Sequence, residues 1–183
     1  MKARMIIALD GHDGSGKTTL AAELGVRLGG NAVRPFSGAA GSKLMEAGER
    51  GWVEELVTVG SKAIDDAIAS VPGASPLVLD RGWLTVASFV PDSELFFRTW
   101  TRWMPTALCW ADLETTLSRL SRRRDENSET EAWHRRYIES YRQLAERSGS
   151  LLLRTDLLDM ESCIDRLIAW IDSGPEPPSF AGN

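Results

Sequence analysis

Short apolar runs and longer amphipathic segments alternate along the whole chain. The apolar runs are bounded by turn residues and predict buried strands at residues 5–9, 31–34, 77–80, 107–110 and 151–154. Apolar residues at helical spacing predict helices at residues 17–28, 53–70, 93–102, 113–123, 130–147 and 160–171. Buried strands that alternate with helices are typical of a parallel sheet covered on both faces, so we predict a three-layer α/β/α fold.

Length and composition indicate the domain organisation of the chain. The chain has 183 residues, 43% of them hydrophobic and 26% charged, which suits one globular domain over residues 1–172. Residues 173–183 contain several prolines and glycines, and we expect a flexible tail there. The run at residues 5–9 is too short for a signal peptide or a membrane span, and the two cysteines show no disulfide framework. We therefore expect a cytoplasmic protein with reduced thiols and no membrane contact.

The first predicted strand runs directly into Gly-His-Asp-Gly-Ser-Gly-Lys-Thr at residues 11–18, which matches the phosphate-binding pattern G-x-x-x-x-G-K-[ST] in full. The glycines let main-chain amides surround phosphate oxygens, and the following helix adds its N-terminal dipole. We expect Lys17 to reach the β- and γ-phosphates and Thr18 to bind Mg²⁺ through its hydroxyl. The predicted ATP-binding residues are Gly11, His12, Asp13, Gly14, Ser15, Gly16, Lys17, Thr18 and Thr19.

The third predicted strand ends in Asp80, and Arg81 follows at once. Ligands of such folds bind at the carboxyl ends of the strands, so we expect Asp80 beside the magnesium ion. Arg81 is expected in the same crevice, where its planar guanidinium can bind a phosphate group. An aspartate that only caps a turn is the alternative, and the neighbouring phosphate loop favours the catalytic interpretation.

A basic cluster, Arg-Leu-Ser-Arg-Arg-Arg at residues 119–124, ends a predicted helix and precedes a polar stretch. A mobile arginine that closes over the transferred phosphoryl group can raise the rate greatly. We therefore expect a lid over about residues 119–131, with Arg122, Arg123 or Arg124 as the catalytic arginine. A solvated basic helix end is the alternative. The net charge of −5 argues against a general nucleic-acid coat, although this cluster leaves a local DNA contact open.

Together, the phosphate loop, the acid–arginine pair and the arginine helix resemble thymidylate kinase and its relatives among the nucleoside and nucleotide kinases. Residues 33–36 (Val-Arg-Pro-Phe), followed by residues 41–44, are similar to the family's Arg-Glu-Pro strand end and the helix after it. Residues 133–136 and Tyr141 have the spacing of its aromatic-and-arginine helix behind the lid. The resemblance covers roughly residues 5 to 170 and implies a P-loop kinase fold with five parallel strands in the order 2-3-1-4-5.

The resemblance also implies roles for individual residues. Asp13 would accept a hydrogen bond from the 3′-hydroxyl of the acceptor sugar, and Arg81 would hold the acceptor's phosphate. Gly14 stands where some members carry an arginine, which implies the type of enzyme whose lid supplies the catalytic arginine. The residues expected to contact the acceptor are Asp13, Arg34, Phe36, Lys62, Arg81 and Trp83.

Three positions depart from the family's pattern. Gly82 replaces the usual Tyr or His after the acid–arginine pair, Thr58 falls where thymidylate kinases place the phenylalanine that stacks on the base, and Lys62 replaces an arginine. Another stacking residue is therefore needed, and the candidates are Trp52, Phe36, Trp83 and Phe89, each with core packing as its alternative. His134 lies on a polar helix, and we expect it to be solvated.

These features predict Mg²⁺-dependent transfer of the γ-phosphoryl group of ATP to a nucleoside monophosphate, such as dTMP or a modified pyrimidine analogue. Two alternatives stay open. The acceptor is instead a nucleoside or a hydroxymethylated base in DNA, or the chain is a nucleotide-binding regulatory protein. A switch protein that reads guanine would need an Asn-Lys-x-Asp stretch, which the sequence lacks. The resemblance also leaves a homodimer open.

Overall fold

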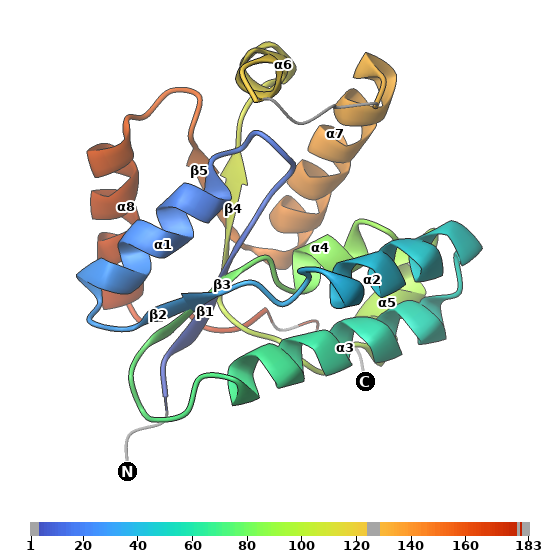
Figure 1. Cartoon of the computed structure of the whole chain (residues 1–183), viewed down its shortest axis with the longest axis horizontal. Helices are drawn as coiled ribbons and strands as arrows, with labels where there is room; N and C mark the ends of the chain where they lie inside the picture. The colour runs from blue at the N-terminus through green and yellow to red at the C-terminus, as the bar shows by residue number, and fades with distance from the viewer. Residues whose placement is uncertain (1–3, 124–128, 179, 181–183) are drawn as a thin grey trace.

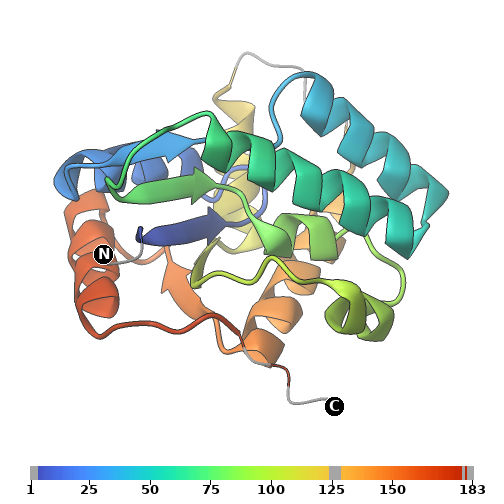
Figure 2. The same ribbon diagram turned by 90° about the horizontal axis from the view of Figure 1, so that it is seen from below.

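One parallel sheet forms the centre of the computed structural model, which describes residues 4–123, 129–178 and 180. The sheet has the order β2-β3-β1-β4-β5, and all of its strand pairs are parallel (Figures 1 and 2). This topology confirms the predicted fold class and strand order. The strands are β1 (Ile6–Asp10), β2 (Asn31–Val33), β3 (Leu77–Asp80), β4 (Thr106–Trp110) and β5 (Leu151–Arg154).

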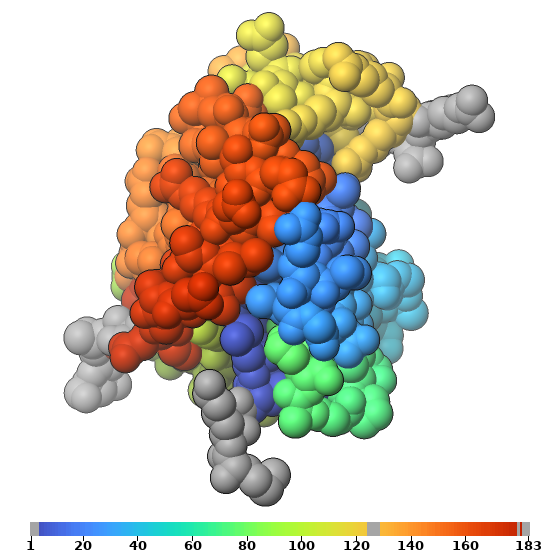
Figure 3. Space-filling model, turned by 90° about the vertical axis from the view of Figure 1, so that its left-hand side faces the viewer, coloured from blue at the N-terminus to red at the C-terminus, as the bar shows by residue number. Residues whose placement is uncertain are grey.

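Helices cover both faces of this sheet. Two of them, α1 (Lys17–Arg27) and α8 (Met160–Asp172), lie side by side on one face, which Figure 3 shows in blue and orange-red. The opposite face carries α3, α4, α5 and α7, and α2 packs on α3 (Figure 1). The bounds of the remaining helices are α2 (Ala39–Arg50), α3 (Val53–Ala69), α4 (Trp83–Ala87), α5 (Ser93–Thr99), α6 (Leu113–Ser121) and α7 (Glu131–Ser148).

The two faces of the sheet are buried in separate cores because side chains alternate along each strand. In β1, Ile7 and Leu9 join the core beneath α1 and α8, whereas Ala8 joins the core on the other side. Leu77 and Leu79 of β3 likewise face the second core, and Val78 faces the first. Burial on both faces explains why the strands read as continuous apolar runs in the sequence.

Two helices are additions to the pattern predicted from periodicity. Helix α2 was expected only through the family resemblance, since its sequence AAGSKLMEAGER buries just Leu44 and Ala47. Helix α4 has five residues, all of them buried, so it has no polar face to produce an amphipathic pattern. The predicted helix at residues 93–102 ends earlier, at Thr99, because Trp100 is extended. The other predicted helix and strand ends agree with the structure to within two residues.

The C-terminal segment is held at one point. The ring of Phe180 packs against Phe97, with centroids 4.2 Å apart, and against Trp103 at 4.7 Å. Both partners belong to the second core or pack directly on it. Within the segment predicted to be a flexible tail, Phe180 thus packs on the core, because an aromatic ring gains from burial against other rings. Among the described residues, no helix combines the length and the apolar character needed to cross a bilayer.

Candidate active site

The phosphate loop lies between β1 and α1, at the carboxyl end of the sheet. Its shape requires glycine, because Gly14 and Gly16 adopt φ of 81° and 83°, a region that other residues rarely occupy. At Gly11, which has φ of 150°, an added Cβ would lie 2.3 Å from the carbonyl oxygen of Cys109. The glycines thus allow the tight loop that leads into α1. The first amides of a helix have no partner within the helix and are free to bind an anion.

Residues that follow β4 and β5 hold this loop in place. Arg119 of α6 donates to the carbonyl of Gly14 at 3.1 Å and to the carbonyl of Thr155 at 2.6 Å. The hydroxyl of Thr155 in turn donates to the carbonyl of Ser15 at 2.7 Å. Arg119, the first residue of the predicted lid, therefore holds the phosphate loop in place through main-chain carbonyls. Sequence reasoning did not identify Thr155, which follows β5 without any motif.

Three charged side chains meet where the phosphate loop faces the sheet edge. Lys17 is 4% exposed; its Nζ donates to the carbonyl of His12 at 3.2 Å and lies 3.6 Å from Asp13 Oδ1. The same Asp13 Oδ1 accepts a short hydrogen bond from Arg81 Nη2. Asp13 is thus shared between the lysine of the phosphate loop and the arginine that follows β3.

The pKa values of these groups reflect their burial and their mutual charges. Burial would raise the pKa of Asp13, but Arg81 and then Lys17 outweigh it and lower that pKa to about 2. Burial lowers the pKa of Lys17 to about 8, with Arg81 adding to this and Asp13 opposing it. At neutral pH Lys17 is therefore still protonated, and a bound polyphosphate would favour that charged form further.

Arg81 is aimed at this cluster by an unusual backbone. Its φ of 85° makes it the one non-glycine residue with positive φ among the described residues. Such a conformation costs on the order of 1 kcal/mol or more and tends to occur at functional sites. The strand turns sharply there, and the guanidinium points back to Asp13 and to the carbonyl of Gly11, 3.4 Å away.

Two aspartates end neighbouring strands and have different surroundings. Asp10 is fully buried and accepts hydrogen bonds from the amide of Gly82 at 3.0 Å and from the amide and hydroxyl of Thr85. Asp80 is 4% exposed; its Oδ2 lies 3.7 Å from Arg34 Nε, while its Oδ1 is buried with no hydrogen-bond partner among the described residues. An orphaned buried carboxylate oxygen is costly, and it is suited to a cation or a donor from a ligand.

Close packing also explains the glycines at positions 82 and 14. A Cβ at position 82 would lie 2.7 Å from the Cβ of Ala8 and 3.2 Å from Asp10 Oδ2, so a tyrosine or histidine has no room there. At Gly14 a Cβ would lie 3.1 Å from the carbonyl of Thr116, and φ is positive. Helix α6 therefore occupies the space that an arginine at position 14 would need.

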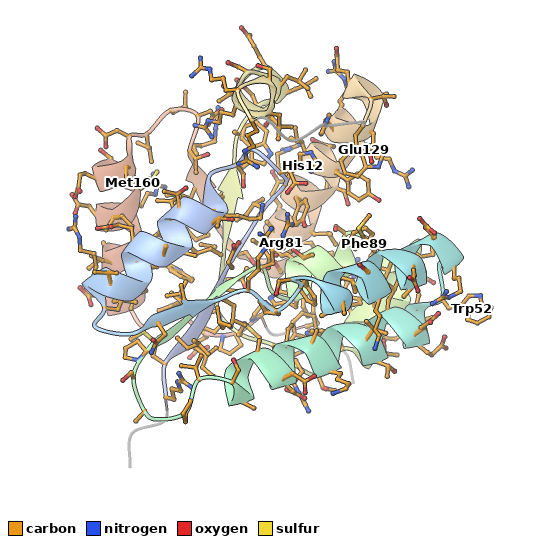
Figure 4. The ribbon with its side chains drawn as sticks, viewed as in Figure 1. His12, Trp52, Arg81, Phe89, Glu129 and Met160 are labelled. Atoms are coloured by element: carbon orange, nitrogen blue, oxygen red, sulfur yellow. The ribbon has the colours of Figure 1, made fainter. Side chains whose placement is uncertain are left out.

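A cavity of about 400 Å³ opens beside the charged cluster, which is within the usual range for small-molecule sites. Its charged end contains Asp13, Arg34 and Arg81, and the rest of its wall is largely apolar and aromatic. Figure 4 shows His12, Arg81, Phe89 and Glu129 around this region. The full lining is His12, Asp13, Arg34, Phe36, Gly41, Leu44, Met45, Arg81, Thr85, Ser88, Phe89, Glu129, Trp133, Tyr137 and Tyr141.

Only some of the residues predicted to bind the acceptor line the cavity. Asp13, Arg34, Phe36 and Arg81 line the cavity. Trp83 is wrong as an acceptor contact, because its ring is fully buried and its Nε1 donates to Thr106 Oγ1 at 2.9 Å.

The other predicted positions lie away from the cavity. Lys62 is 74% exposed on α3, pairs with Asp66 and is absent from the cavity lining, so the structure corrects its predicted contact. Trp52 is 65% exposed and points away at the junction of α2 and α3 (Figure 4). In the lid prediction, Arg122 and Arg123 are exposed beyond the end of α6 and do not line the cavity. Arg124 lies outside the described residues, as do residues 125–128.

A buried histidine pair links the phosphate loop to α7. His12 Nε2 lies 2.7 Å from His134 Nδ1, and the two residues are 7% and 1% exposed. The prediction that His134 is solvated is therefore wrong, because α7 turns this residue inward onto the loop. Burial lowers the pKa of His12 to about 4, with Asp13 opposing the shift and His134 adding to it. In this hydrogen bond one of the two facing nitrogens is the donor and the other the acceptor, and the lowered pKa of His12 keeps its own imidazole neutral at pH 7.

This histidine pair predicts a loss of stability in mild acid. The pKa of His12 is lower in the folded chain than its ordinary value of 6.5, so the unfolded chain binds the proton more tightly. Its contribution is fully present above about pH 6.5 and is lost as the pH falls towards 4, by about 1.4 kcal/mol per pH unit and about 3 kcal/mol in all. Urea unfolding of the wild type and of His12→Asn across pH 4 to 7 measures this. A slope between pH 6.5 and 4.5 that is equal in both proteins would contradict it.

A second, smaller cavity of about 190 Å³ lies on the other side of the phosphate loop. It is lined by Gly16 and Thr19 of the loop and α1, by Arg119, and by residues that follow β5. These last residues are Thr155, Leu158, Met160 and Cys163. The phosphate loop therefore separates two cavities, with Lys17 and the N-terminus of α1 between them.

Neither a protein-family model nor a curated protein sequence matches the chain. Solved structures do match. The deoxyadenosine kinase from M. mycoides, with dCMP and a flexible dCDP bound, has a TM-score of 0.65 at 17% identity, over 92% of this chain and 100% of that one. The thymidylate kinase from Candida albicans gives 0.63 at 14%, over 93% and 92%. The YorR protein from Bacillus subtilis, in complex with phosphorylated GDP, gives 0.60 at 17%, over 92% and 96%.

The chain has the P-loop kinase fold. The resemblance inferred from the sequence is confirmed at this level. Within the P-loop kinase fold, both cavities lie at the carboxyl ends of the parallel strands, where ligands of doubly wound sheets bind. Identities of 14 to 17% support the fold and do not define a substrate.

Proposed function

We propose that the chain transfers the γ-phosphoryl group of ATP to the phosphate of a nucleoside monophosphate. The observation that carries this proposal is the sharing of Asp13 between Lys17 and Arg81. Lys17 belongs to the loop for the donor's phosphates, and Arg81 belongs to the cavity for the acceptor. One carboxylate therefore holds the two cations side by side, and two phosphate groups bound to them would be adjacent. The names of the similar structures support phosphoryl transfer to a nucleoside or nucleotide: the deoxyadenosine kinase is named for a nucleoside and the thymidylate kinase for a nucleotide.

The phosphate loop would bind the donor. Its amides at the start of α1 and the ammonium of Lys17 would hold the β- and γ-phosphates, and the smaller cavity beside Gly16 and Thr19 would hold the donor's base. Arg119 and Thr155 would keep the loop in its binding shape through their bonds to Gly14 and Ser15. Because these contacts are already formed, little reorganisation is needed when the nucleotide binds.

Magnesium fits the same place. Asp80 offers a buried Oδ1 without a partner among the described residues, and Thr18 is exposed at the start of α1. Among residues 4–123, 129–178 and 180, no cluster of three or more His, Cys, Asp or Glu side chains is suited to hold a metal. In sites for Mg²⁺ and a nucleotide, one or two protein oxygens and the phosphates usually hold the ion. When bound, the ion would neutralise charge on the transferring group.

The acceptor's phosphate would lie at the charged end of the larger cavity. The half-buried Arg81 lines the cavity there, and so does Arg34, which pairs with Asp80. An arginine can bind a phosphate through two parallel hydrogen bonds, which gives position as well as affinity. Two arginines at this end support a phosphorylated acceptor over an uncharged nucleoside. Arg122, Arg123 and Arg124 remain candidates for charge stabilisation by a lid.

The test is the dependence of ATP consumption on an acceptor. The protein is incubated with Mg·ATP and a panel of ribo- and deoxynucleoside monophosphates, with the matching nucleosides as a second panel. We expect ADP formation only with monophosphates and a diphosphate as the second product. If only nucleosides are phosphorylated, the acceptor is a nucleoside and not a monophosphate. ATP hydrolysis that needs no acceptor would favour a regulatory nucleotide-binding protein.

A further inference from the structure

The larger cavity has an aromatic side that the proposed transfer does not use. We define the aromatic wall as Phe89, Trp133 and Tyr137. All three line the cavity and are half-buried, so part of each ring faces open space. The ring centroids of Trp133 and Tyr137 are 4.4 Å apart, and those of Tyr137 and Phe89 are 6.0 Å apart. The wall is therefore continuous from the first turn of α7 to Phe89, two residues after the end of α4.

The sequence builds this wall at helical spacing. Trp133, Tyr137 and Tyr141 are four residues apart on α7, which puts them on one face of the helix, and all three line the cavity. The wall also contacts the phosphate loop, because the ring of His12 lies 5.3 Å from that of Trp133 and 6.3 Å from that of Tyr137. Rings held in this way are ordered before any ligand binds, which lowers the entropic cost of binding.

Apolar residues of α2 and of the segment after β2 also line the cavity. Phe36 is 8% exposed and lines the cavity after β2, and helix α2 contributes Gly41, Leu44 and Met45. Met45 is 59% exposed, and its flexible thioether can follow the outline of a flat ligand. Helix α3, by contrast, contains no aromatic residue at all. Thr58 in particular donates its hydroxyl to the carbonyl of Glu54 and is absent from the cavity lining.

We infer that the aromatic wall stacks on the base of the acceptor, with Phe36, Leu44 and Met45 covering the other face of that base. The inference rests on the proposed function for the place of the acceptor's phosphate, at Asp13, Arg34 and Arg81. Those residues and the aromatic wall line one and the same cavity, so a ligand whose anionic group binds the former can place its base against the latter. A planar heterocycle gains from stacking on aromatic rings, and this gain does not depend strongly on which base it is.

The experiment compares a complete nucleotide with one that lacks its base. Calorimetry without ATP measures the binding of the four deoxynucleoside monophosphates and of 2-deoxyribose 5-phosphate to the wild type, Tyr137→Ala, Tyr137→Phe and Trp52→Ala. We expect the wild type to prefer the best nucleotide by about tenfold to a hundredfold. Tyr137→Ala should lose most of that preference by weaker binding of the nucleotide alone. Tyr137→Phe and the remote Trp52→Ala should keep it.

The outcomes separate this inference from the proposed function. A preference that survives in Tyr137→Ala, an equal loss for both ligands, or no nucleotide preference in the wild type overturns the stacking role of the wall. Circular dichroism of each variant shows whether it is folded, and Trp133→Ala provides an independent second removal from the wall. Phosphoryl transfer is measured separately. If binding depends on the base but no phosphoryl transfer occurs, only the proposed function is contradicted. If transfer occurs and Tyr137→Ala still prefers the nucleotide over 2-deoxyribose 5-phosphate, only the stacking role of the wall is contradicted.

Discussion

Replacing Lys17 with alanine is expected to lower the rate of phosphoryl transfer by at least about a hundredfold, because the ammonium is aimed at the charge that develops on the transferring group. The side chain is buried in the loop and touches the carbonyl of His12 and the carboxylate of Asp13. Its removal leaves Asp13 with Arg81 as a partner, so the fold should persist. Initial rates at saturating acceptor, together with circular dichroism, measure both effects.

Lys62→Ala is the matched control for this change. Lys62 is exposed on α3 and makes one ion pair with Asp66, a contact of the kind that contributes little to stability. Its removal should leave the transfer rate unchanged within about twofold. Wild-type activity in Lys17→Ala would contradict the assignment of the phosphate loop, and an equal loss in both variants would show that the effect is not local.

Replacing Arg81 with glycine is expected to lower kcat/KM for a nucleoside monophosphate by about a hundredfold, with little change in the KM for ATP. Glycine is the informative choice because it accepts the φ of 85° at this position, so the guanidinium is removed without backbone strain. Charge-assisted hydrogen bonds contribute about 1.5–3 kcal/mol each, and the estimate assumes that the acceptor's phosphate loses this contact. Steady-state kinetics with each substrate varied in turn measures the two effects.

Arg102→Ala serves as the control for Arg81→Gly. Arg102 is an exposed arginine that pairs with Asp65 on α3, and it lies outside the cavity lining. A second comparison uses two acceptors. If Arg81 binds the phosphate of the acceptor, Arg81→Gly should lose activity with the monophosphate but keep whatever activity the wild type has with the nucleoside. A similar proportional loss for both acceptors would assign Arg81 to the loop and not to the acceptor.

The parts of the site that could be predicted from sequence are those that are local in the chain. A strand, a glycine loop and a helix are consecutive at residues 6–27, and each has its own signal in the sequence. The same holds for β3, Asp80 and Arg81. Their convergence at one sheet edge followed from the parallel arrangement, because all parallel strands place their carboxyl ends together.

The parts that could not be predicted depend on packing between distant segments. The partner of His12 is His134, 122 positions away, and nothing near His134 marks it as buried. Trp83 seemed available for stacking, but the short buried helix α4 turns it into the core. The aromatic spacing of Trp133, Tyr137 and Tyr141 was visible in the sequence, whereas their position across a cavity from α2 was not. Helix α2 itself has too few buried residues to produce a clear periodic signal.

The proposed transfer between two adjacent phosphate sites is tested most directly by following the products of one reaction mixture. Phosphorus NMR of the protein with Mg·ATP and its preferred nucleoside monophosphate resolves ADP, nucleoside diphosphate and inorganic phosphate at once. We expect ADP and the new diphosphate to rise in equal amounts while inorganic phosphate stays at the level of a protein-free control. The appearance of inorganic phosphate in step with ADP, or no change in any signal, would contradict the proposed transfer.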